Sequence, residues 1–266
     1  MISCLWLRRI SWLVRCAWPV RFAWLCALPL ACTTLSTKQA EAPLLFETLR
    51  QNDAPFSLRA SDQIPPCDVD WQWQLVDSAG RATNAATVNC KTSESKSHGA
   101  LWMIPTIDGD REFVTRDASD TMCLVAVEAL LDNAISVFTP PLMLAPSELQ
   151  PGETFASRSE MRVDWLDGRG ERDRGMGERT ATIVGASRIR TPLGEFVVTR
   201  VQTKFEAKLR FAKVERTTTL WIAAGIGPIV EEWRERVTVM GVPISSDSGT
   251  AIRISPISRA KDTPRH

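Results

Sequence analysis

The stretch Lys204-Phe205-Glu206-Ala207-Lys208-Leu209-Arg210-Phe211 shows the clearest alternation of polar and apolar residues in the chain. Successive side chains of a β-strand point to opposite faces of its sheet, so this pattern predicts a strand with one buried and one solvated face. Similar period-two stretches fill most of the C-terminal half: Thr154–Trp165, Arg179–Ser187, Glu195–Val214, Thr217–Ala224 and Ile229–Met240. Turn signals separate them at Asp167-Gly168, Pro192-Leu193-Gly194 and Gly225-Ile226-Gly227-Pro228. We therefore expect an antiparallel meander of long strands.

The N-terminal half gives weaker strand signals. Strict alternation predicts a strand from Val69 to Leu75, and shorter strands are expected at Ala100–Thr106 and Phe113–Thr115. The polar stretch from Asp77 to Gly99 reads as a long hairpin or an insertion. The run from Met122 to Leu131 fits a helix or a buried strand, and its surroundings favour the strand. The predicted fold is mainly β: one long-stranded antiparallel sheet curled into an open or half barrel, with few helices.

Residues 1–31 have the charge order of a secretory signal peptide. Four arginines make the first 21 residues basic, an uncharged apolar run follows from Phe22 to Ala31, and no acidic residue occurs before Glu41. Ten apolar residues rise only about 15 Å as a helix, half of the roughly 30 Å hydrocarbon core of a bilayer. The pattern indicates export rather than a stable transmembrane span.

The end of this segment resembles a bacterial lipobox, in which a cysteine after a small residue becomes the lipidated first residue of the mature protein. Leu30 and Ala31 suit that pattern, whereas Pro29 stands where Leu, Val or Ile is usual. Ordinary cleavage after Ala31 is the alternative, and Pro29 disfavours it as well. We predict lipid attachment at Cys32.

A second alternative is cleavage after Ala42, which would leave Pro43 directly after the cut. With lipidation, Thr33 follows the modified cysteine, and resemblance to Gram-negative lipoproteins then indicates the outer membrane, facing the periplasm. The expected organisation is a signal peptide over 1–31, a linker or tether over 32–60, a β-rich domain over 61–256 and a disordered tail over 257–266. Within the tether, a short helix is expected around Leu44 to Leu49.

The composition excludes some classes of partner. Without residues 1–31 the chain keeps 235 residues, enough for one sizeable domain or two small ones, with 28 basic and 31 acidic residues. A balance so close to neutral lacks the electrostatic footprint of a nucleic-acid binder. No nucleic acid partner and no cofactor are expected.

Three cysteines follow Cys32 in the sequence. Cys67 and Cys90 bracket a strand and a polar loop, so they are the preferred disulfide pair in an oxidising envelope. Cys123 lies in the apolar run CLVAVEALL, where a small buried hydrophobe is expected. Neither His98 nor His266 has a second His or Cys at ligand spacing, so no metal site is predicted.

Candidate catalytic groups are scarce. Glu231 and Glu235 share one face of a predicted strand about 13 Å apart, which is too far for a glycosidase pair. Because Trp233 lies on the same face, a partly exposed sheet or a cavity lining is one interpretation, and an edge or surface strand is the default. No catalytic residue is predicted, and we expect a protein that is not an enzyme.

Three stretches together resemble a class of bacterial envelope proteins. They are PPLMLAPSELQPGETF (Pro140 to Phe155), TPLGEFVVTRVQT (Thr191 to Thr203) and TTLWIAAGIGPIVEEW (Thr218 to Trp233). In order and spacing they are similar to the TapB-like group and a neighbouring domain of unknown function. That resemblance implies a secreted or lipid-anchored β protein, related in fold to the open-barrel carriers LolA and LolB. The chain departs from the pattern at Trp221–Ala224 and at Pro228, and the class has no established catalytic residue.

These observations lead to a non-enzymatic function. The leading hypothesis is an exported, lipid-anchored envelope protein that binds an apolar ligand or a partner on the concave face of its sheet. Trp71, Trp73, Trp165 and Trp233 are the candidate lining residues. The second hypothesis is a structural or assembly lipoprotein that acts through protein contacts and holds no small ligand. An envelope hydrolase is the third, and it would need a convergent Ser or Asp site that the sequence order does not reveal.

Overall fold

The structure is a computed structural model that describes residues 46–64, 70–77, 82–89, 91–95, 99–106 and 109–255. Nearly all of these residues belong to strands. The strands are β1 (Glu47–Asp53), β2 (Leu58–Arg59), β3 (Asp70–Val76), β4 (Ala82–Asn89), β5 (Lys91–Ser95), β6 (Gly99–Pro105), β7 (Arg111–Arg116), β8 (Met122–Ala129), β9 (Ala134–Ala145), β10 (Glu148–Leu149), β11 (Thr154–Trp165), β12 (Glu171–Thr191), β13 (Gly194–Leu209), β14 (Ala212–Ala223), β15 (Gly227–Val239) and β16 (Val242–Arg253). The helix α1 (Ala60–Gln63) is a single turn between β2 and β3. None of the described helical residues forms a segment long and apolar enough to cross a bilayer.

One antiparallel sheet of 14 strands makes up the fold. Its order is β4-β3-β16-β15-β14-β13-β12-β11-β9-β8-β7-β6-β5, and β1 pairs with β12 outside this path. β4 and β5 stand at opposite ends of the order, so the sheet is curled but not closed into a barrel. The prediction of a mainly β fold with one long-stranded curled sheet is confirmed.

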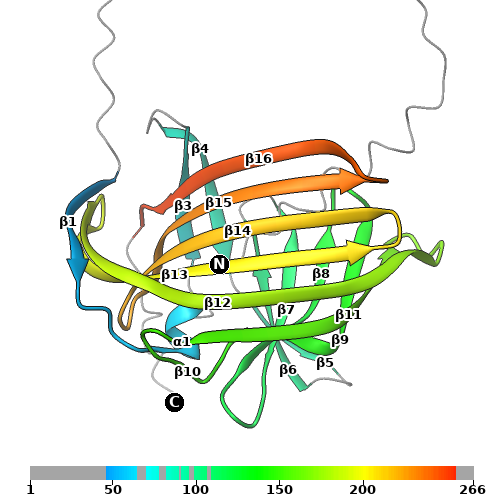
Figure 1. The fold of residues 1–266 in the computed structure, drawn as a ribbon, viewed down its shortest axis with the longest axis horizontal. Coiled ribbons are helices and arrows are strands. Elements are labelled where there is room, and N and C mark those ends of the chain that lie inside the picture. Colours follow the sequence, from blue (N-terminus) through cyan, green and yellow to red (C-terminus); the bar gives the residue numbers. More distant parts are fainter. Residues whose placement is uncertain are drawn as a thin grey trace, which may run out of the picture.

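The curl brings the two halves of the sheet across one another. In Figure 1 the long strands β12 to β16 run across the front of the view, and β3 to β8 lie behind them in a steeply different direction. β2 and β10 form a separate two-stranded ribbon. β1 lies at the left-hand side of the same view, far from the right-hand ends of β13 to β16.

Tight turns connect the long strands where glycine was expected. The β12–β13 hairpin closes with Thr191 opposite Gly194, and the β14–β15 hairpin closes with Ala223 opposite Gly227. Gly194 has φ +123° and Gly227 has φ +92°, conformations that side chains with a Cβ rarely adopt. These two turn predictions are confirmed.

The stretch Glu195–Val214 differs from its predicted form, because it holds two strands and not one. β13 ends at Leu209 and β14 begins at Ala212, with Arg210 and Phe211 in the turn between them. Polar and apolar residues keep alternating through this two-residue turn, so the sequence pattern carries no sign of it. Alternation reports the faces of a strand and says nothing about the reversal of its direction.

Other elements also differ from expectation. Met122–Ala129 is a strand, as favoured, whereas the helix expected around residues 44–49 is wrong over its described part, because residues 47–53 form β1 and pair with β12. The strand β16 was not predicted. Its sequence VPISSDSGTAIR is mostly polar, and its first four positions are nearly all exposed.

The main core lies inside the curl, on what we call the inner face of the sheet. One cluster joins side chains from both halves, including Trp73 of β3, Val114 of β7, Phe138 of β9, Val214 of β14 and Val237 of β15, all at most 2% exposed. Because both halves contribute to the same cluster, the sheet itself supplies the two layers that a β-sandwich takes from two sheets.

Two smaller clusters complete the burial. The β2–β10 ribbon places Leu58 and Leu149 over Val201 and Leu220. At the residue of β14 that follows Leu220, the ring of Phe46 meets the indole of Trp221 edge to face, with 5.1 Å between ring centroids. The segment that begins at Phe46 therefore packs on the sheet together with β1.

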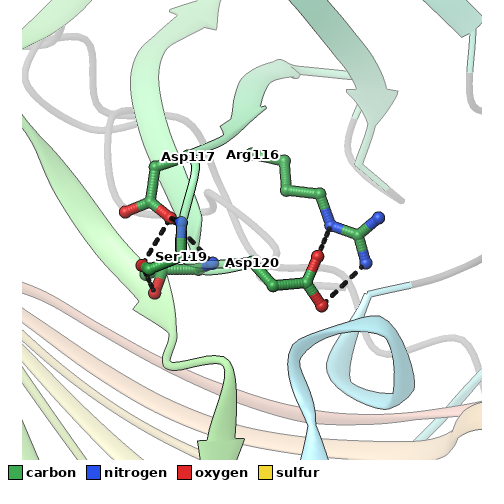
Figure 2. A network of polar contacts seen from close by, with 5 residues as sticks. Arg116, Asp117, Ser119 and Asp120 are labelled. Atoms are coloured by element: carbon green, nitrogen blue, oxygen red, sulfur yellow. Dashed lines mark hydrogen bonds and ion pairs between the residues drawn. The ribbon is translucent and has the colours of Figure 1, made fainter.

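The turn from β7 to β8 is closed by its own side chains (Figure 2). The carboxylate of Asp117 accepts hydrogen bonds from the hydroxyl of Ser119 at 2.6 Å, from the amide of Ser119 at 2.8 Å and from the amide of Thr121 at 3.0 Å. These bonds, that of the Ser119 hydroxyl first, lower the pKa of Asp117. Beside them, Arg116 and Asp120 form an ion pair with 2.6 Å between Nε and Oδ1. The turn fixes the start of β8.

Gly249 is predicted to be required by Trp233, its partner in the β15–β16 register. A Cβ at position 249 would lie 2.3 Å from Cζ2 of Trp233. We expect Gly249→Ala to lower the free energy of unfolding by about 1–3 kcal/mol through overpacking, although alanine is otherwise the better strand residue. Urea denaturation measures the change. The same substitution beside Trp233→Leu should be nearly neutral, and an equal cost in both backgrounds would contradict the steric explanation.

Candidate functional site

Three of the four candidate tryptophans lie together in the main core. Trp71 and Trp73 of β3 are 1% and 0% exposed, and Trp233 of β15 is 6% exposed. Trp165 lies apart from them at the end of β11, where the guanidinium groups of Arg169 and Arg172 lie 3.8 and 4.5 Å from its ring centroid. Lining of a ligand cavity by these four residues stays a prediction.

The inner face also carries a buried ion network that joins β14 and β15. Arg216 lies opposite Glu235 in the register of these strands, and its Nη1 is 3.4 Å from a carboxylate oxygen of Glu235. Its Nη2 is 3.3 Å from a carboxylate oxygen of Glu231. Nε donates to the hydroxyl of Thr218 at 3.1 Å, and the guanidinium lies 5.7 Å from the ring centroid of Trp233. One guanidinium thus connects two carboxylates on either side of Trp233.

This arrangement corrects the default interpretation of Glu231 and Glu235. β15 is a central strand between β14 and β16, and the side chains of the three charged residues are at most 3% exposed. The prediction of an edge or surface strand for these residues is therefore wrong. Two carboxylates can be buried on a central strand because the adjacent strand places a guanidinium between them.

Two more arginines are buried in the sheet. Arg253 of β16 is 0% exposed, donates from Nη1 to the carbonyl of Ile226 at 3.1 Å and lies 5.1 Å from the ring centroid of Trp71. Arg179 of β12 donates to the carbonyl of Leu144. Burial lowers the pKa of each arginine to about 10, and for Arg179 the charge of Glu112 opposes that shift.

These charged residues were missed in the sequence, although a signal for one exists. Arg216 lies on the same face of its strand as Val214 and Leu220, and this face points into the core. A charge at such a position, two strand positions from Thr218 and next to a strand with Glu231 and Glu235, indicates a buried pair once the register is known. The register depends on the hairpin turn, which alternation alone does not locate.

The other face of the sheet carries two grooves. The first is lined mainly by polar groups, whereas the second is lined by polar and apolar groups in similar measure, the apolar ones from Val137, Met161 and Met176. One groove of about 510 Å³ crosses β13 to β16. Its lining includes Gln202, Thr217, Thr219, Glu232, Arg234, Ser248 and Thr250. These positions alternate with the buried ones, so the groove lies on the outer face. A second groove, of about 560 Å³, crosses β9, β11 and β12 and includes Glu160, Arg162 and Arg174.

Glu232 is the half-buried carboxyl of the first groove. Desolvation by burial raises its pKa, and the charges of Arg200 and Arg234 oppose that shift. The hydroxyl, amide and charged groups around it offer hydrogen bonds to a polar surface. They do not form the mostly apolar lining that is typical of a site for an apolar ligand.

Several predicted site residues lie outside the described residues. They are Cys32, the candidate disulfide pair Cys67 and Cys90, and both histidines, His98 and His266. Cys123 is described: it is 9% exposed and free, and burial followed by the charge of Asp117 raises the pKa of its thiol. Within the described part of the chain, no group of three His, Cys, Asp or Glu residues could hold a metal ion.

No protein-family model matches the sequence, and no curated protein matches it. Three solved structures share a distant likeness, each with a TM-score of 0.36. A lipoprotein candidate from Parabacteroides distasonis is 9% identical and is matched over 76% of this chain and 98% of its own. The hypothetical lipoprotein YmcC of Escherichia coli is 12% identical, over 73% and 90%. An exported-protein candidate with a YmcC-like fold from Bacteroides fragilis is also 12% identical, over 75% and 100%.

The ion network yields a prediction about stability. Arg216→Met leaves two buried carboxylates without their cation and should lower the free energy of unfolding by about 3–5 kcal/mol. Urea denaturation measures it, with Arg158→Met as the control. Arg158 is 65% exposed and pairs with Glu178 at 3.2 Å on the surface, so its removal should cost at most about 1 kcal/mol. Equal effects of the two substitutions would contradict the network.

Glu232 and Glu206 are predicted to give opposite pH dependences. Burial raises the pKa of Glu232 above 4.5, so its ionisation destabilises the native state as the pH rises through the folded value. The hydrogen bond from Lys213 lowers the pKa of Glu206, so its charge contributes stability that is lost as the pH falls through the folded value.

Glu232→Gln should therefore raise the melting temperature at neutral pH and leave it unchanged in acid. Glu206→Gln should lower the melting temperature at neutral pH and also leave it unchanged in acid. Thermal unfolding between about pH 3 and pH 7, on either side of the usual carboxyl pKa, separates the two cases. A shift of the same sign for both variants would refute the assignment.

Proposed function

We propose that this chain is an exported, non-enzymatic envelope protein, anchored by a lipid on Cys32, that acts through contacts of its surface with another envelope protein. One observation carries the choice of surface contacts over an internal cargo. The inner face of the curled sheet is filled by its own side chains, including Trp71, Trp73 and Phe138, each at most 2% exposed. An apolar ligand would have to displace this core.

The export signal and the lipobox-like end of residues 1–31 support the location. Thr33 after the modified cysteine supports a location at the outer membrane, with the domain facing the periplasm. Thirteen residues lie between Cys32 and Phe46, and this connection spans at most about 50 Å when extended. The domain can therefore reach a partner at some distance from the membrane.

The chemistry of the described side chains supports a binding role. The carboxylates of Glu231 and Glu235 are held by Arg216 and are buried, so they are not available to a substrate. The thiol of Cys123 is buried, and its raised pKa makes it a poor nucleophile. Polar groups gather instead in the outer groove around Glu232, which suits hydrogen bonds to a protein surface.

Native mass spectrometry of the full-length protein, purified gently from its own membrane, tests this proposal. We expect a mature chain that begins at Cys32 and carries acyl mass, with no small apolar molecule released on activation. The variant Cys32→Ser should lack the acyl mass. An unmodified chain cut elsewhere would overturn the anchor, and a releasable lipid-like mass would overturn the surface-contact role in favour of a ligand carrier.

A further inference from the structure

Exposed apolar side chains gather at one rim of the sheet. Eight large apolar side chains are exposed among the described residues, and six of them lie in or beside hairpin turns at the same end of the strands. These six, which we call the apolar rim, are Leu130 (41% exposed), Leu131 (67%), Phe211 (53%), Met240 (82%), Val242 (62%) and Ile244 (37%). The remaining two, Val184 and Val197, lie within β12 and β13.

Backbone hydrogen bonds join the hairpin turns into one continuous edge. The amide of Met240 donates to the carbonyl of Phe211 at 3.0 Å, which ties the β15–β16 turn to the β13–β14 turn. The amide of Arg210 donates to Arg174 at 3.1 Å, and the amide of Leu166 donates to Asn133 at 3.0 Å. In Figure 1 the turns of β13–β14 and β15–β16 lie together at the right-hand side.

The residue at the tip of the β15–β16 hairpin departs from what its turn favours. Met240 and Gly241 both have positive φ, +49° and +81°. Two-residue turns of this kind favour Asn or Asp before the glycine, since few side chains adopt a positive φ readily. Here the position carries a methionine that is 82% exposed. A long apolar side chain at this point gains nothing from the turn or from the core, which indicates a contact outside the domain.

Cationic groups accompany the apolar ones at this rim. Arg210 lies with its guanidinium 5.8 Å from the ring centroid of Phe211, and Arg169 and Arg172 lie against Trp165. The β13–β14 hairpin over residues 204–215 holds four basic and two acidic residues. Projecting apolar tips flanked by arginine and lysine complement the acyl region and the phosphates of a lipid bilayer. A protein partner would need hollows that match several separate tips.

We infer that the apolar rim inserts into the headgroup boundary of an anionic lipid bilayer and gives the domain a second membrane contact beside its anchor. The inference rests on the proposed envelope location. Glu47 of β1 pairs with Arg190, and from there β12 runs 15 residues to Gly175, or about 50 Å. The 13 residues between Cys32 and Phe46 span a similar length when extended, so the anchor and the rim can reach the same bilayer.

The test places an environment-sensitive nitrobenzoxadiazole label on the rim of the full-length protein in vesicles of phosphatidylethanolamine and phosphatidylglycerol. Met240→Cys carries the label, and Val184→Cys is the matched control, because Val184 is 45% exposed but lies away from the rim. The parent chain, labelled in parallel, gives the background of its own cysteines. We expect blue-shifted emission and several-fold stronger quenching by spin-labelled lipids at position 240 than at position 184.

A second variant tests the rim without a label on it. Phe211→Ser together with Met240→Ser should keep the melting temperature of the parent, because both side chains are exposed, and should weaken the response of a label placed at Val242→Cys. Equal emission at positions 240 and 184 would overturn the inference. A shift that appears without vesicles and grows with protein concentration would overturn it too, in favour of a second copy of the chain.

The experiment tests the lipid anchor and the membrane contact of the apolar rim independently. The mass of the N-terminal peptide, measured on the same sample, reports acylation of Cys32, whereas the label reports the position of the rim. An acylated chain with a solvated rim would keep the proposed function and refute this inference. An unacylated chain whose rim label still enters added vesicles would do the reverse.

Discussion

The structure depends on one constraint: a single sheet has to bury its own apolar face. Its one described helix, α1, is a single turn and cannot form a covering layer. The sheet therefore curls until side chains of β3, β7 and β9 meet those of β14 and β15 in one cluster. The close approach sets local demands. Gly177, for example, leaves room for the rings of Phe138 and Phe205, which would lie 3.2 and 3.4 Å from a Cβ at that position.

The ion network of Arg216 follows from the same curl. On an open sheet these charges would face water, where an ion pair contributes little to stability. Inside the curl, solvent is excluded, and each charge must find its partner in the protein. A slip of one residue between β14 and β15 would turn Arg216 to the outer face and leave Glu231 and Glu235 buried alone. The network thus penalises wrong registers of the two central strands more strongly than apolar contacts would.

Much of the fold could be predicted from the sequence because alternation is a local property. The strand over Thr154–Trp165 has the predicted bounds, and the turns at Gly194 and Gly227 lie where glycine placed them. The predictions failed where the structure depends on contacts between residues that are distant in the sequence. The turn at Arg210 and Phe211 does not interrupt the alternation of polar and apolar residues. The strand β16 is mostly polar, and it is part of the sheet because it pairs with β15 and β3.

The candidate site was less accessible to prediction, for a physical reason. A tryptophan that lines a cavity and a tryptophan that fills it occupy the same strand positions. The sequence therefore identifies Trp71, Trp73 and Trp233 as inward-facing residues, but it does not distinguish a cavity lining from a packed core. The charged residues beside them can be recognised as a buried network only when their partners are known. Arg216 is informative once Glu231 and Glu235 are known to face it, and that knowledge requires the register.

A filled interior changes where this protein can interact with its surroundings. The inner face is occupied by the core and its ion network, so the surfaces open to contact are the outer grooves and the edges of the sheet. These differ in chemistry, because the groove around Glu232 offers mostly hydroxyl, amide and charged groups whereas the hairpin turns at Phe211 and Met240 offer apolar side chains. One surface suits a hydrated protein partner and the other suits a lipid interface. The curled sheet presents these two kinds of surface on different parts of one continuous layer.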